Sequence, residues 1–176
     1  CRIFAYSSRV MPWFGNPNRV IRGCICFCLL AMQSLQAQEN LVHGFVERVS
    51  DGDTLRIRTA EGTVVVRLAG IDAPEKRQPF GRAASRHLAE ICLGKQADAD
   101  ARKKDRYGRT VARLRCEGAD PSSALLSEGL AWHYVKYARE QPQTEREADA
   151  SAEIAAREKR LGLWAGAEAI PPWEFR

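Results

Sequence analysis

The chain has 176 residues, which is enough for one domain with an ordinary core. Its formal net charge is +5, but four of its 27 basic residues lie within residues 1–37, which contain no acidic residue. The remaining 23 basic residues face 22 acidic ones, so the rest of the chain is nearly neutral. Global charge therefore gives no argument for a nucleic-acid partner.

The first 37 residues are expected to form a signal peptide with a short upstream extension, with Met11 as the start. Arg19 and Arg22 form a basic region, and residues 24–32 form an apolar run. That run is too short to cross a bilayer, which needs about 20 apolar residues. A buried N-terminal helix and an uncleaved anchor are the alternatives. We expect no stable membrane span after cleavage.

Cleavage after Ala37 would leave residues 38–176 as the mature domain, exported to the periplasm or secreted. Its only cysteines are then Cys92 and Cys116. An even count in an exported chain predicts one disulfide between them. Two buried thiols are the alternative.

Hydrophobic periodicity in the mature chain predicts five strands and three helices. Residues 41–49 indicate a first strand and residues 55–68 a hairpin, because apolar and polar residues alternate there. The strands that follow a first helix are predicted at 97–101 and 110–116. The three helices are expected at 84–92, at 121–129 with Asp120 as the N-cap, and at 144–160.

This order predicts an α+β, mainly β fold: a five-stranded Greek-key barrel of the OB-fold kind, with three helices. The segment 70–80 is expected to be a loop, and residues 171–173 an extended strap over the domain.

Carboxylates and arginines are the candidates for chemistry, because His43, His87 and His133 lack metal-ligand spacing. Two acidic groups lie at adjoining strand ends, Asp51-Gly52-Asp53-Thr54 and Asp72-Ala73-Pro74-Glu75. Carboxylates joined by a backbone carbonyl are the oxygen ligands that Ca²⁺ prefers. Taken alone, Asp-Gly-Asp is more typical of a plain turn.

Two arginines stand near these acids in the predicted topology. Arg67 lies on the strand that leads to Asp72, and Arg109 follows a turn at residues 105–108. Guanidinium groups bind phosphate oxygens bidentately and stabilise the charge that develops in phosphoryl transfer. A surface salt bridge is the alternative for each arginine. The combination of acids and arginines favours phosphodiester chemistry.

A cluster of basic residues supports this interpretation. From Lys76 to Arg115 there are 12 Lys or Arg against four acids. Such clustering is typical of a surface that binds phosphates, but a solvated surface explains it equally well.

The sequence from about Val42 to Trp164 resembles the thermonuclease, or staphylococcal nuclease-like, family. Besides the two acidic groups, the resemblance rests on three motifs: Val66-Arg67-Leu68-Ala69-Gly70-Ile71, Asp105-Arg106-Tyr107-Gly108-Arg109 and Gly129-Leu130-Ala131-Trp132. The fold that it implies is the five-stranded barrel.

The resemblance also implies roles. Asp53 and Asp72 would be Ca²⁺ carboxylates, with the carbonyl of Ala73 as a further ligand. Glu75 would position or deprotonate the attacking water, while Arg67 and Arg109 would bind the scissile phosphate. The substrate contacts would be Tyr107, Arg106, Tyr137 and Tyr134.

The sequence departs from the family pattern at three places around this site. Ala73 replaces a threonine of the best-known member. The metal ligand is kept if only the backbone oxygen of this residue binds the metal. The loop from Glu75 to Gly81 is shorter, with Lys76 and Arg77 as its basic residues. Val135 stands where that member has a pocket tyrosine, and the adjacent Tyr134 is the candidate substitute.

The sequence therefore predicts an exported, monomeric, Ca²⁺-dependent nuclease that cleaves DNA and/or RNA to 3′-phosphorylated products. One alternative is a catalytically weak OB-fold module that only binds nucleic acid. Another is a structural envelope protein whose carboxylates merely bind Ca²⁺. The presence of Arg67, Glu75 and Arg109 beside the aspartates favours the enzyme.

Overall fold

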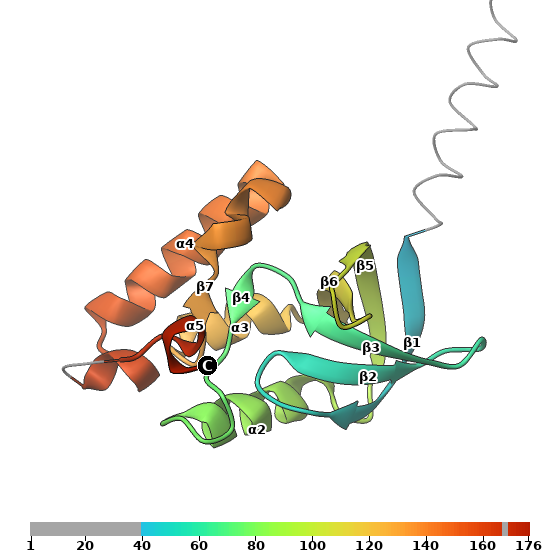
Figure 1. The fold of residues 1–176 in the computed structure, drawn as a ribbon, viewed down its shortest axis with the longest axis horizontal. Coiled ribbons are helices and arrows are strands. Elements are labelled where there is room, and N and C mark those ends of the chain that lie inside the picture. Colours follow the sequence, from blue (N-terminus) through green and yellow to red (C-terminus); the bar gives the residue numbers. More distant parts are fainter. Residues whose placement is uncertain (1–39, 167–168) are drawn as a thin grey trace, which may run out of the picture. The chain divides into compact units, whose positions relative to one another are not determined.

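Five strands close into a barrel in the computed structural model, which describes residues 40–166 and 169–176 (Figure 1). The predicted signal peptide lies outside these residues. The strand order is β1-β2-β3-β6-β5. The bounds are β1 Leu41–Val49, β2 Thr54–Arg58, β3 Thr63–Leu68, β5 Gln96–Lys104 and β6 Thr110–Cys116. The predicted OB-like barrel is confirmed.

Strand pairing follows from the alternation of side chains. β1, β2 and β3 pair antiparallel in sequence, β3 pairs parallel with β6, and β5 pairs antiparallel with both β6 and β1. Every second residue of a strand points inward. The core of the barrel accordingly holds the inward residues of each strand, among them Val46, Leu55, Ile57, Val66, Leu68, Ala97, Ala99 and Leu114.

Three helices lie where the sequence predicts them: α2 Gly81–Cys92, α3 Pro121–Ser127 and α4 Gln143–Glu158. Asp120 caps α3, because its side chain accepts hydrogen bonds from the amides of Ser122 and Ser123. Two 3₁₀ helices were not predicted, η1 Val135–Glu140 and η2 Gly162–Ala165.

The expectation of an extended strap at residues 171–173 was wrong. These residues enter a short helix, α5 Pro172–Phe175, with Pro172 in its first turn. Proline has no amide hydrogen to donate and a φ angle suited to a helix start, so it favours this position.

A two-stranded sheet outside the barrel also departs from the prediction. Within the segment expected to be a loop, β4 Ile71–Asp72 pairs antiparallel with β7 Trp132–His133. Two-residue strands are too short to show a periodic pattern. Pairing with β7 fixes the backbone of Asp72, and Trp132 packs edge-on against Trp173 of α5.

A buried polar network joins the barrel to the helices. Arg113 of β6 donates hydrogen bonds to both carboxylate oxygens of Asp149 on α4, at 3.0 and 2.8 Å. Its Nε also donates to Asp120 at 2.7 Å. Gln141 donates to Asp149 and contacts His133 of β7. The network therefore runs from α4 and the barrel to the strand that pairs with β4.

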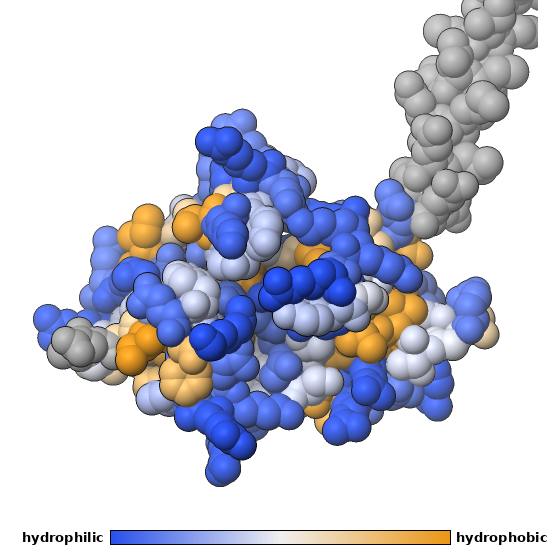
Figure 2. Space-filling model, viewed as in Figure 1, coloured by the Kyte–Doolittle hydropathy of each residue, from blue (hydrophilic) through white to orange (hydrophobic). Residues whose placement is uncertain are grey.

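The outer surface is largely hydrophilic in the view of Figure 2, with separate hydrophobic patches. Exposed large hydrophobic residues come from distant parts of the sequence, such as Leu41, Leu93 and Ile154. Scattered residues of this kind are normal on a folded domain. Within the described residues, no helix combines the length and apolar character needed to cross a membrane.

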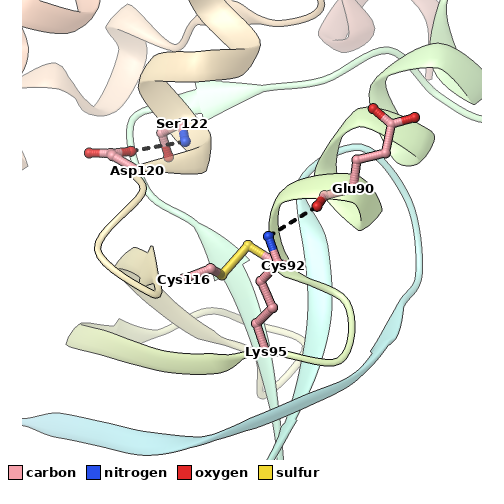
Figure 3. Close-up of a disulfide and its surroundings, with 6 residues drawn as sticks. All are labelled: Glu90, Cys92, Lys95, Cys116, Asp120 and Ser122. Atoms are coloured by element: carbon pink, nitrogen blue, oxygen red, sulfur yellow. Dashed lines mark hydrogen bonds between the residues drawn. A yellow bond between two sulfur atoms is a disulfide. The ribbon is translucent and has the colours of Figure 1, made fainter.

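A disulfide links the C-terminal residue of α2 to the C-terminal residue of β6 (Figure 3). The Cα atoms of Cys92 and Cys116 lie 5.2 Å apart, and both residues are buried in the core. This separation lies within the range that a disulfide requires. The bond closes a loop with a sequence separation of 24, which includes Arg109.

We expect Cys92 and Cys116 to resist alkylation in the native, unreduced protein. Replacing both with alanine should lower the free energy of unfolding by about 3 kcal/mol, because the unfolded chain regains loop entropy. Peptide mapping after alkylation and urea denaturation measure the two effects. Alkylation of both residues without reductant would show that the thiols are unbonded.

Candidate active site

Two acidic loops meet beside the N-terminal part of α2. One carries Asp51 and Asp53 between β1 and β2, and the other follows β4 and carries Ala73 and Glu75. Gly52 makes this approach possible. A Cβ atom there would lie 2.6 Å from the Cβ of Ala73, which is closer than real side chains pack. Any larger residue at position 52 would separate the loops.

Asp53 and Asp72 share one arginine. Nη2 of Arg67 lies 2.7 Å from Oδ1 of Asp72 and 3.2 Å from Oδ2 of Asp53. The backbone amide of Ala73 also donates to Oδ2 of Asp53, at 3.2 Å. Asp72 is fully buried and Asp53 nearly so. The structure thus brings together the two predicted metal carboxylates, the backbone of Ala73 and one predicted catalytic arginine.

The concentration of negative charge changes the acidity of these groups. Burial and the neighbouring Asp53 raise the pKa of Asp51 to about 6. The same two causes raise the pKa of Asp72 above its ordinary value, against the opposing effect of Arg67. Carboxylates that repel one another in a partly desolvated site bind cations favourably.

Arg109 lies on the turn between β5 and β6. Its Nε donates to Oδ2 of Asp105 at 2.7 Å, and its Nη1 lies 3.4 Å from Oγ1 of Thr54. Asp105 therefore fixes the guanidinium near Asp53. In the same turn, Nη2 of Arg106 donates to the hydroxyl of Tyr107, whose ring is largely exposed.

Glu75 is held at both its backbone and its carboxylate. Its amide donates to Oε1 of Gln78 at 2.7 Å, and Gln78 in turn donates to the carbonyl of Ile170. Nε of Arg176 donates to Oε1 of Glu75 at 2.5 Å, while Nη2 of Arg176 donates to Oδ1 of Asp72 at 2.7 Å. Arg176 thus bridges a predicted metal ligand and the predicted base.

The predicted residues line two adjoining cavities. One of about 210 Å³ contains Asp53, Ala73 and Glu75 together with the arginines and Tyr107. A second, of about 430 Å³, contains Tyr134 and Tyr137. Both cavities share Arg67, Arg106, Tyr107, Arg109 and Arg176. Asp72 lies behind the first cavity and is not part of its lining.

The second cavity combines aromatic and basic side chains. The rings of Tyr134 and Tyr137 meet edge to face at 5.3 Å, and Trp173 stacks on Tyr134 at 5.4 Å. Nζ of Lys103 lies 4.6 Å from the centre of the Tyr137 ring. Tyr134 therefore occupies the pocket beside Tyr137, whereas the adjacent Val135 is exposed without lining it.

The donor atoms fit a hard cation better than zinc. Asp53, Asp72 and Ala73 offer only oxygen, and Oδ2 of Asp72 is buried without a hydrogen-bond partner in the described part of the chain. Within residues 40–166 and 169–176, no three His, Cys, Asp or Glu side chains are grouped to hold a metal. A cation here would thus need backbone carbonyl or water oxygens to complete its shell.

Sequence reasoning missed three contributors to this site. Gln78 and Arg176 gave no signal, because their contacts join segments 92 and 104 residues apart. Asp51 was visible within the Asp-Gly-Asp motif but was assigned no role. Its contact with the amide of Asp53 could have been expected, since Asp often accepts a bond from the backbone two residues on.

Comparisons with known proteins agree with this geometry. The model of a family described as "Staphylococcal nuclease homologue" matches residues 65–166. An uncharacterized endonuclease of Escherichia coli O157:H7 is 33% identical over 138 residues, covering 77% of this chain and 85% of that protein. A micrococcal nuclease of Shigella flexneri is 36% identical over 142 residues, covering 76% and 79%.

A plant relative, the staphylococcal-like nuclease CAN1 of Arabidopsis thaliana, is 40% identical over 111 residues. The match covers 63% of this chain but only 32% of the plant protein. The family model, however, covers more than half of this chain, and the bacterial relatives match over most of their length. The chain belongs to the staphylococcal nuclease family.

Proposed function

We propose that this protein is a Ca²⁺-dependent nuclease that hydrolyses phosphodiester bonds of DNA and/or RNA. The observation that carries the proposal is the convergence of Asp53, Glu75, Arg67 and Arg109 on one cavity, with Asp72 directly behind it. A module that only binds nucleic acid needs no buried pair of carboxylates facing two arginines. The endonuclease and nuclease names of the bacterial relatives support the same activity.

A calcium ion would be held by the carboxylates of Asp53 and Asp72 and by the carbonyl of Ala73. When bound, it would supply positive charge that polarises the scissile phosphate. The unpartnered Oδ2 of Asp72 and the oxygen-only donor set support this assignment.

The arginines bind and stabilise the phosphate in the proposed reaction. Arg67 is anchored by Asp53 and Asp72, and Arg109 by Asp105, so both guanidinium groups are oriented before substrate arrives. Donors fixed in advance stabilise developing charge without reorganising during the reaction. Arg67 and Arg109 both line the two cavities, so they lie where a phosphate would meet the acidic loops.

Glu75 acts on the water molecule in this scheme. Arg176 engages Oε1 of Glu75, so Oε2 remains to accept the proton of an attacking water. The water oxygen bonds to phosphorus, and the bond to the 5′ oxygen breaks. That oxygen leaves as a 5′-hydroxyl after taking up a proton from solvent, to which Glu75 releases the proton that it accepted. The phosphate stays on the 3′ end.

The neighbouring cavity suits a nucleotide of the substrate. Bases stack on aromatic rings with little sequence preference, and basic side chains bind the backbone. Tyr134 and Tyr137 provide the rings, while Lys103, Lys104 and Lys136 line the same cavity. These features serve DNA and RNA alike, and Tyr107 with Arg106 lies at the junction of the two cavities.

We further infer that the protein is exported and acts as a monomer. The basic and apolar pattern within residues 1–37 supports a signal peptide. The Cys92–Cys116 disulfide suits an oxidising compartment such as the periplasm or the extracellular medium.

The proposed function predicts that the purified protein cleaves plasmid DNA or structured RNA with Ca²⁺ and loses this activity in excess chelator. Restoring Ca²⁺ should restore cleavage, because the oxygen ligands release and rebind a hard cation. Gel analysis of both substrates measures the effect. Undiminished cleavage in chelator would show that the reaction needs no metal. Absence of cleavage of both substrates would contradict the proposed nuclease activity.

Glu75→Gln should lower turnover by about 10²- to 10⁴-fold, the usual contribution of a positioned base. Arg109→Ala should lower it by about 10²- to 10³-fold through loss of an oriented donor. Glu61→Gln, an exposed acid in the β2–β3 turn, is the matched control and should keep full activity. Losses under threefold in Glu75→Gln and Arg109→Ala, with unchanged circular dichroism, would show that other groups perform the chemistry.

Arg176→Gln should tighten Ca²⁺ binding, because Arg176 places a competing positive charge on Asp72 and Glu75. We expect about a fivefold lower Kd, since two unit charges about 4 Å apart interact by roughly 1 kcal/mol in water. Calorimetric titration of Ca²⁺ measures the Kd. The control is the variant Arg115→Gln, at an exposed arginine of β6. Equal or weaker binding by Arg176→Gln would contradict the competition.

A further inference from the structure

A second basic surface lies outside the two cavities of the proposed active site. It is a groove of about 620 Å³ between the end of β1, the loop after Glu75 and the exposed face of α2. One carboxylate, Glu47, lines it. The five cations that line it are Arg48, Lys76, Arg77, Arg82 and Arg86.

These five cations differ from the arginines of the site and the core. Arg67, Arg109 and Arg113 each lie within ion-pair distance of a carboxylate. No ion pair involving the groove cations is formed with any residue in the described ranges. Among the described residues, no carboxylate therefore neutralises their positive charge, which favours binding of an anionic ligand.

The groove is continuous with the proposed active site. Lys76 and Arg77 line the groove, and they also line a smaller cavity together with Asp51, Glu75 and Arg176. Asp51, Glu75 and Arg176 in turn line the cavity that holds the acidic loops. A chain molecule can thus pass from the scissile position, beside Glu75, into the groove.

The spacing of the cations suits a polymer of phosphates. Arg82 and Arg86 are exposed and lie four residues apart, hence on one face of α2 about one helical turn from each other. Lys76 and Arg77 precede α2 in the chain and line the same groove, as does Arg48 of β1. The groove therefore draws five cations from three segments, which is more than one small anion needs.

The lining also indicates which part of the polymer is held. No aromatic side chain lines the groove, and its apolar members are small or aliphatic, such as Val49, Ala89 and Leu93. The aromatic rings on which bases stack are instead those of the tyrosines, which lie in a cavity that shares no residue with the groove. The groove offers guanidinium and ammonium groups, which bind backbone phosphates.

We propose that this groove binds the phosphodiester backbone of the substrate strand beyond the scissile phosphate, on a different side from the tyrosine cavity. The inference rests on the proposed function and extends it. The strand would contact tyrosines through a base on one side of the cut and cations through phosphates on the other. Such binding depends on substrate length and salt, but carries no sequence preference.

The test uses the double variant Arg82→Gln/Arg86→Gln, which keeps helix-forming residues in α2. Arg115→Gln/Lys159→Gln is the matched control, because both of its residues are exposed cations outside every cavity described above. Binding is measured by fluorescence anisotropy in chelator, where no cleavage interferes. The probe is a labelled single-stranded oligonucleotide of about 16 nucleotides, the upper site size of an OB fold.

The groove variant should lower the salt dependence of binding by about 1.4 in the slope of log K against log salt, at about 0.7 per lost phosphate contact. With Ca²⁺, its KM for the long oligonucleotide should rise, while its KM for a dinucleotide with one scissile bond stays unchanged. The control variant should match the wild type in all three measurements.

An unchanged salt slope in the groove variant, with normal binding by the wild type, would overturn the groove assignment and leave the proposed function intact. A KM that rises equally for the dinucleotide would also overturn it, because the arginines would then act at the scissile phosphate. Failure of the wild type to cleave any nucleic acid would instead count against the proposed function, whatever the anisotropy shows.

Discussion

The ion pair between Arg113 and Asp149 is the constraint on which the rest of the structure depends. Asp149 is fully buried, and a buried carboxylate without a partner costs several kcal/mol. Arg113 satisfies both of its oxygens, while Gln141 donates to one of them at 2.8 Å. The barrel strand β6 and the helix α4 must therefore stay in fixed register to keep these charges paired.

This constraint reaches the proposed active site through backbone pairing. Gln141 contacts His133 at 3.2 Å, and His133 pairs with Ile71, the residue before Asp72. The chain also turns at Gly70, where φ is +78° and a Cβ atom would lie 2.1 Å from Nε2 of Gln141. Only glycine fits so close to the network. The position of Asp72 thus depends on how Gly70, Gln141 and His133 pack against one another.

The carboxylates near Gly52 are arranged differently from the buried pair of Arg113 and Asp149, because they lie next to other carboxylates. The core pairs its charges closely, whereas the site keeps Asp51, Asp53 and Asp72 near one another. Burial, together with the charge of Asp53, raises the pKa of Asp51 to about 6. A protein tolerates such repulsion where a ligand relieves it. Arg176 relieves part of it in this structure, by bridging Asp72 and Glu75. We infer that a cation and a phosphate relieve the rest.

The sequence predicted the strands and helices whose own residues carry a clear pattern. Alternation indicated the strands of the barrel, and Asp120 with Pro121 indicated the start of α3. The acidic motifs fell at strand ends, so topology alone predicted that Asp53 and Asp72 would meet. What could not be predicted depends on long-range contacts. The two-residue strands β4 and β7 have no period, and Arg176 reaches its partners across more than a hundred residues.

The free energy of unfolding of Arg113→Met measures directly whether the buried pair holds the fold together. We expect a loss of about 3 to 5 kcal/mol, because Asp149 would remain buried without its main partner. Arg115→Met, two residues along the same strand and exposed, should change stability by no more than about 0.5 kcal/mol. A similar small change in both variants, measured by urea denaturation, would contradict the claim that the buried pair fixes the fold around the site.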